Sequence, residues 1–160
     1  MKILKPLIIL TLVLFATEQL YSQNMDTELE KEAVTKVMKS YKNALQNLTT
    51  EGTFELFAED SHVFESGGVE GSYANYIEHH LGPELGHFNK FEYSDYEIDV
   101  QVDAPYAFTT ETYIYTIVIK PDEKGKSKTI KKKGVATSIL KKTNSNWKII
   151  KMHSSSRNPK

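Results

Sequence analysis

The chain of 160 residues contains no cysteine, and this absence excludes several chemistries at once. Disulfide bonds, a thiol nucleophile, thiolate metal ligands and a bacterial lipoprotein anchor all require cysteine. The sequence also has only one tryptophan and five prolines, and no internal repeat or low-complexity segment divides it. The core must therefore be stabilised by burial of side chains, and the length is sufficient for one domain but not for two.

The chain also lacks an excess of charge of either sign, with 20 Lys and Arg residues against 21 Asp and Glu residues. Nucleic-acid binding requires a basic face, so we expect no nucleic-acid partner. The one locally basic run, residues 126–133, alternates with turn and strand residues. This pattern is typical of a solvated hairpin edge, where lysine opposes aggregation.

A long hydrophobic run is also missing, because the apolar stretch of residues 7–16 is too short to span a bilayer. It follows Lys2 and Lys5, and a basic segment before a short apolar one is typical of a signal peptide. We therefore predict a signal peptide in residues 1–23 and a single domain in residues 24–160. The protein is expected to be exported, periplasmic or secreted, with no membrane attachment after cleavage. The alternative is an uncleaved N-terminal anchor.

The first half of the remaining chain has the periodicity of helices. Residues 28–48 carry one apolar stripe at three- and four-residue spacing, which predicts a long helix. A short helix is expected at residues 53–58 and a short strand at 62–66. Ser72 can cap a third helix that runs to Leu81 and ends at Gly82-Pro83. The stripe of the first helix consists of Ala33, Val34, Val37, Met38, Tyr41, Ala44, Leu45 and Leu48.

The second half is rich in β-branched and aromatic residues and predicts strands. The four expected strands are residues 91–102, 106–120, 128–142 and 146–156. Phe91 and Tyr93 are out of phase with the apolar residues that follow, and a bulge near Ser94-Asp95 would restore the alternation. Helices followed by an antiparallel meander indicate an α+β fold.

Three motifs resemble those of a known family: Glu65-Ser66-Gly67-Gly68, the segment His79–Leu85, and the closing segment Trp147–Arg157. They are similar to the SnoaL-like branch of the NTF2-like superfamily, over roughly Glu28–Arg157. The closing segment also resembles the association domain of the calmodulin-dependent kinases. The resemblance implies an NTF2-like cone: N-terminal helices packed on a strongly curved antiparallel sheet, as in a cystatin-like α+β barrel. It further implies an interior pocket and a homodimer formed through the open sheet.

His80 is the first candidate for a catalytic residue. It shares a helix face with Tyr73 and Tyr76, and a histidine there titrates near neutral pH. It could act as a general acid or base, or orient a ligand; alternatively, it is a core histidine bonded to a backbone carbonyl or carboxylate. Glu65 precedes two glycines and could hold the His80 imidazole in one tautomer. The alternative for Glu65 is an exposed charge at a strand end.

Glu111 is the third catalytic candidate, because strand alternation places it on one face with Tyr113 and Tyr115. A carboxylate beside tyrosines inside this fold is similar to the arrangement in ketosteroid isomerase. There a base removes a carbon-bound proton and a phenol stabilises the oxyanion. The carboxylate positions of this chain depart from that pattern, and no aspartate is assigned as the base.

Candidate ligand-binding residues come from several elements. Strand alternation places Trp147 and His153 on one face of the last strand and Met152 on the other, so that His153 faces either the pocket or a subunit interface. Arg157 could bind a carboxylate or phosphate, or be solvated near the terminus. The complete ligand-binding set is Tyr41, Tyr73, Tyr76, His79, Tyr113, Tyr115, His153 and Arg157.

We expect no metal and no cofactor. His79 and His80 point about 100° apart on a helix, and no His-x-x-x-His spacing occurs in the chain. The leading hypothesis is an exported protein that binds a small, partly apolar molecule. The first alternative is an isomerase, cyclase or dehydratase that uses a histidine–carboxylate pair for proton transfer. The second is a dimeric assembly module without a ligand, because the implied fold hosts all three classes.

Overall fold

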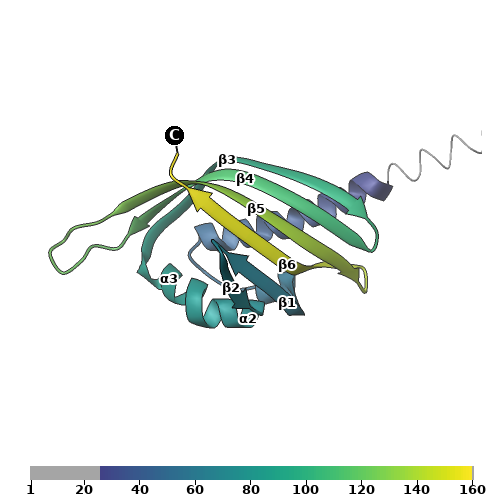
Figure 1. The fold of residues 1–160 in the computed structure, drawn as a ribbon, viewed down its shortest axis with the longest axis horizontal. Helices are drawn as coiled ribbons and strands as arrows, with labels where there is room; N and C mark the ends of the chain where they lie inside the picture. The colour runs from purple at the N-terminus through teal and green to yellow at the C-terminus, as the bar shows by residue number, and fades with distance from the viewer. Residues whose placement is uncertain (1–25, 160) are drawn as a thin grey trace, which may run out of the picture.

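We describe residues 26–159 of a computed structural model (Figure 1). The predicted signal peptide, residues 1–23, lies outside the described residues. None of the helices within residues 26–159 has the length and apolar character that spanning a bilayer requires.

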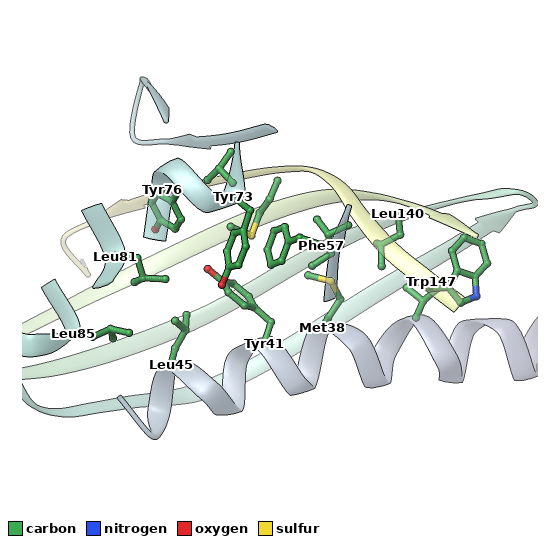
Figure 2. Close-up of a cluster of buried hydrophobic side chains, with 14 of the residues drawn as sticks. Met38, Tyr41, Leu45, Phe57, Tyr73, Tyr76, Leu81, Leu85, Leu140 and Trp147 are labelled. Carbon is green, nitrogen blue, oxygen red and sulfur yellow. The ribbon is translucent and has the colours of Figure 1, made fainter. Parts of the chain in front are cut away.

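The N-terminal helix covers residues 26–46, in agreement with the periodicity of the sequence. Its buried positions are Val34, Met38, Tyr41 and Leu45, spaced by three or four residues. Figure 2 shows Met38, Tyr41 and Leu45 pointing from one face of this helix into the hydrophobic core. Each fully buried side chain of this size contributes about 1.5–3 kcal/mol. The stripe therefore fixes which face of the helix meets the sheet.

Six strands form one curved sheet in the order β2-β1-β6-β5-β4-β3. The long strands arch over the N-terminal helix (Figure 1), and neighbours from β3 to β6 are antiparallel, which confirms the predicted meander. β1, however, pairs with β6 in parallel, so the sheet is mixed rather than antiparallel. The sheet has free edges at β2 and β3 and does not close into a barrel. The bounds are β1 Phe57–Glu65, β2 Gly68–Gly71, β3 Phe88–Asp103, β4 Tyr106–Ile119, β5 Thr129–Thr143 and β6 Asn146–Arg157.

The prediction of a short helix at residues 53–58 was wrong. Only the 3₁₀ turn η1 (Phe54–Leu56) forms, and β1 begins at once with Phe57. The Phe57 ring stacks on Tyr73, with ring centroids 3.6 Å apart. The run Phe54-Glu55-Leu56-Phe57 fits a helix or a strand equally well from its sequence alone. The contact between Phe57 and Tyr73, which are distant in the chain, favours the strand.

The third helix begins as expected, because the Ser72 hydroxyl accepts a hydrogen bond from the Asn75 backbone N–H at 3.2 Å. It does not end at Gly82-Pro83. α2 (Tyr73–Tyr76) passes through the π-helical turn η2 (Ile77–Leu81) into α3 (Gly82–His87). The wider turn places Pro83 at the start of α3, where its missing N–H costs little. Gly82 is needed there, since a Cβ would lie 2.5 Å from the Ile77 carbonyl oxygen.

Two bulges set which side chains face the core. The predicted bulge in β3 is confirmed, with a register shift between Ser94 and Glu97 and a positive φ of 50° at Asp95. A second bulge lies in β6, where Ile149 pairs with β5, Ile150 has no partner and Lys151 pairs again. The alternation therefore reverses at Ile150, which the sequence analysis did not anticipate.

Candidate functional site

A cavity of about 440 Å³ lies on the inner side of the sheet, between the N-terminal helix and the α2–α3 segment. Aromatic and aliphatic side chains make up most of its lining, with a few charged groups among them. The tyrosines are Tyr41, Tyr76, Tyr93, Tyr96, Tyr113 and Tyr115; the apolar residues include Leu45, Leu81, Phe88, Phe91, Ile117, Ile119 and Ile130. The charged residues are Lys42, Glu65, Glu84, Glu111 and Lys132.

The floor of the cavity consists of small residues on β5 and β6. Ala136 and Ser154 pair with one another and line the cavity, and Gly134 pairs with Ser156 one row further along. The Tyr113 ring packs against Gly134 so closely that no Cβ would fit there. These small side chains leave room above the sheet, while tyrosines stand around it.

Glu65 ends β1 and is held by a tyrosine from α2. The Tyr76 hydroxyl donates a hydrogen bond to the Glu65 Oε2 atom at 2.5 Å. Burial raises the pKa of Tyr76, and the negative charge of Glu65 raises it further. The proton therefore stays on the phenol, and the carboxylate accepts it as a hydrogen bond.

Glu111 on β4 forms a second pair of the same kind, with the Tyr96 hydroxyl donating to its Oε1 atom at 2.5 Å. The residue is buried, with 6% of its surface exposed. Burial raises the pKa of Glu111, while the hydrogen bond from Tyr96 and the charge of Lys42 lower it. The Lys42 ammonium lies 4.7 Å from the centre of the Tyr96 ring, a cation–π distance. A carboxyl group with a raised pKa in a cavity is a candidate for proton transfer.

His80 lies near the rim and not in the cavity lining. Its Nδ1 atom is 3.0 Å from the Glu70 carboxylate on β2, and its Nε2 atom is 3.5 Å from Glu84. The hydrogen bond to Glu70 raises the pKa of His80, while partial burial lowers it. Burial raises the pKa of Glu84. The predicted pairing of His80 with Glu65 is therefore not formed, because Glu65 is bonded to Tyr76 and His80 to Glu70.

The other predicted site residues divide into two groups. Tyr41, Tyr76, Tyr113 and Tyr115 line the cavity, and their role in ligand binding stays a prediction. Tyr73 is buried against Phe57 and does not line the cavity, and His79 is exposed beside Glu78.

The bulge in β6 decides the position of the last two candidates. Met152 and Ser154 line the cavity, so His153 between them is exposed on the outer face of the sheet. The expectation that Trp147 and His153 share a face was wrong, since Trp147 is buried. Arg157 is exposed at the end of β6, opposite Lys133 of β5.

Five charged or tyrosine residues of the cavity were missed by the sequence analysis: Lys42, Glu84, Tyr93, Tyr96 and Lys132. Tyr93 and Tyr96 stand on either side of the β3 bulge, and their opposite parity was the signal that could have placed both inside. Lys42 and Glu84 belong to no apolar pattern in the sequence, so no sequence signal placed them in the cavity. Within residues 26–159, no group of three or more His, Asp and Glu side chains is placed to hold a metal ion.

The family model of the SnoaL-like domain matches residues 34–159 of this sequence. The chain belongs to the SnoaL-like domain family. A search of curated protein sequences found no match. Solved structures of NTF2-like proteins resemble this SnoaL-like protein over most of its length, which confirms the NTF2-like α+β fold.

Three of these structures illustrate the range of proteins that share this fold. A candidate dehydratase from Streptomyces avermitilis has a TM-score of 0.69 and 15% identity, over 82% of this chain and 98% of its own. A candidate ketosteroid isomerase from Shewanella frigidimarina has a TM-score of 0.62 and 26% identity, over 77% and 94%. A candidate calcium/calmodulin-dependent kinase II association domain from Xanthomonas campestris has a TM-score of 0.54 and 21% identity, over 78% and 85%.

Proposed function

We propose that this SnoaL-like protein binds a small, partly apolar molecule in the cavity between its helices and sheet. The observation that carries this proposal is the cavity of about 440 Å³, which is walled by tyrosines and aliphatic side chains and contains two tyrosine–glutamate pairs. Small-molecule sites are mostly apolar hollows of about 300–1,000 Å³ with a few convergent polar groups.

The test uses a dye whose fluorescence rises in apolar surroundings, 8-anilinonaphthalene-1-sulfonate. Ala136 lies on the cavity floor, so Ala136→Phe should fill the space and abolish dye binding. Thr137 is the next residue of β5 and is exposed on the opposite face, so Thr137→Phe is the matched control and should leave binding unchanged. Dye binding that survives Ala136→Phe in a folded protein would contradict the proposal.

A second candidate function, an isomerase-type enzyme, is favoured by the raised pKa of Glu111 inside the cavity. The Shewanella neighbour adds support at 26% identity. Glu111 would then act as the base, in place of the histidine that the sequence suggested. Ketosteroid isomerisation, followed by the ultraviolet absorbance of the conjugated product, tests this candidate. Turnover that is lost in Glu111→Gln with the dye still bound would favour the enzyme over the binding protein.

We also propose that the protein is exported and forms a homodimer through the outer face of its sheet. Phe108 and Val135 support the dimer, because both are large apolar side chains exposed on that face, by 42% and 41%. The basic and apolar N-terminal residues support export. Sedimentation velocity at several concentrations tests the dimer, and a Phe108→Lys variant should shift it toward the monomer. A concentration-dependent dimer that binds no dye would instead favour an assembly module.

A further inference from the structure

The two glutamates of the cavity lie in one row across the sheet. Glu65 of β1 pairs with Ser154 of β6, Ser154 with Ala136 of β5, and Ala136 with Glu111 of β4. Three interstrand steps separate their backbones, a distance of about 14 Å at the usual strand spacing. Both side chains line the cavity on the same inner face of a curved sheet, so their carboxylates stand at its two sides and face a common space.

Small side chains separate the two glutamates along this row of the sheet. The two positions between them in the row are Ser154 and Ala136, which have the smallest side chains of the row. In the next row the Tyr113 ring covers Gly134, so the open floor is the row of Ser154 and Ala136. A flat apolar body could therefore rest on this floor and reach both ends of the row.

Each end of the row presents a hydrogen-bond acceptor. A carboxylate has about four acceptor positions, and one of them is used by the phenol of Tyr76 or Tyr96. Within residues 26–159, no Lys or Arg side chain lies within 4.0 Å of either carboxylate. Each carboxylate can therefore accept further hydrogen bonds besides the one from its phenol, at the buried Glu111 and at the half-buried Glu65.

We infer that the ligand of this cavity is an apolar, rigid molecule with a hydroxyl group at each end, one bound by Glu65 and the other by Glu111. This inference rests on the proposed binding function. Hydroxyls fit better than ammonium groups, because Lys42 already places a positive charge beside the Glu111 end. The aromatic and aliphatic walls contact the middle of the molecule.

The test compares three probes of nearly equal size and shape: biphenyl-4,4′-diol, 4′-methoxybiphenyl-4-ol and 4,4′-dimethoxybiphenyl. Their affinities for the purified protein are measured by ligand-observed NMR. Each methyl cap removes one donor, so affinity should fall about tenfold per cap, the usual worth of a hydrogen bond to a charged group. Glu65→Gln and Glu111→Gln should each weaken the diol about tenfold and barely change the dimethyl ether.

Glu97→Gln is the matched control, because Glu97 is an exposed glutamate of β3 that does not line the cavity. It should leave all three affinities unchanged. Equal affinities of the three probes, all lost in Ala136→Phe, would overturn the two-hydroxyl inference and leave the binding function standing. Failure of the diol to bind while the dye still reports the cavity would also overturn it. Failure of the dye and all three probes would count against the binding function itself.

Discussion

Gly134→Ala tests whether the cavity wall is packed as tightly as the structure indicates. A Cβ at position 134 would overlap the Tyr113 ring, with the Cζ atom at 2.8 Å and the Cδ2 atom at 2.9 Å. Real Cβ contacts at such distances are essentially absent, so the ring or the strand must move. The Tyr113 ring is also held on another side by Tyr93, with ring centroids 5.0 Å apart. The Tyr115 ring is a second neighbour, with its centroid at 6.3 Å, and the Tyr113 ring also borders the cavity, so a displaced ring can move into that space.

The size of the effect follows from two opposing contributions. Overpacking of this kind costs about 1–3 kcal/mol. Replacing a strand glycine by alanine recovers about 0.5–1 kcal/mol of conformational entropy. Gly134→Ala should therefore reduce the free energy of unfolding by about 1–2 kcal/mol and weaken dye binding, because the displaced ring occupies the cavity.

Urea unfolding followed by circular dichroism gives the free energy. Gly86→Ala is the control, since a Cβ there would meet no atom within 4 Å and should not destabilise the protein. In a double variant with Tyr113→Ala the overlap disappears, so the cost of Gly134→Ala should fall to zero or change sign. A Gly134→Ala protein as stable as the parent, with effects that add in the double variant, would refute this account of the wall.

Three further predictions concern ionisable groups. Side-chain hydrogen bonds lower the pKa of Glu30, so the roughly 1 kcal/mol that it contributes should be present above about pH 4.5 and vanish as pH falls through its lower folded pKa. Urea unfolding of the parent and of Glu30→Gln at pH 7 and pH 3 checks this. An equal loss of unfolding free energy at the two pH values would contradict it. Glu70 raises the pKa of His80, so the parent's advantage over His80→Gln should be full below about pH 6.5 and disappear above the folded pKa; an advantage independent of pH would point to packing. Burial raises the pKa of Glu111, so Glu111→Gln should gain stability relative to the parent as pH rises above about 4.5. A relative stability that stays flat from pH 4 to 8 would show that Glu111 is not destabilised by burial.

The parts of the fold that could be predicted from the sequence are those with a local signal. The stripe of the first helix repeats with the helical period, and the change of phase around Ser94 marks the β3 bulge. The parallel pairing of β1 with β6 has no such signal, because it joins segments about 90 residues apart in the chain and depends on the whole sheet. The β6 bulge falls between Ile149 and Ile150, and two adjacent isoleucines give no change of polarity that would reveal a shift of phase.

The candidate site was predictable only as far as single elements reach. Alternation along β4 placed Glu111, Tyr113 and Tyr115 on one face, and the structure places all three around the cavity. The partner of each carboxylate was not predictable. Glu70 reaches His80 because a tight hairpin returns β2 beside β1, and the sequence showed no strand there.

These partners change which group is the better candidate for chemistry in this cavity. A histidine is the usual choice for proton transfer because it titrates near neutral pH. His80, however, is bonded to Glu70 at the rim, where its side chain is 31% exposed, and it does not line the cavity. Glu111 lines the cavity, is buried, and has a raised pKa together with a phenol donor. A reaction that uses Glu111 as its base would therefore depend on a carboxylate and a phenol, and its pH profile would follow Glu111 rather than His80.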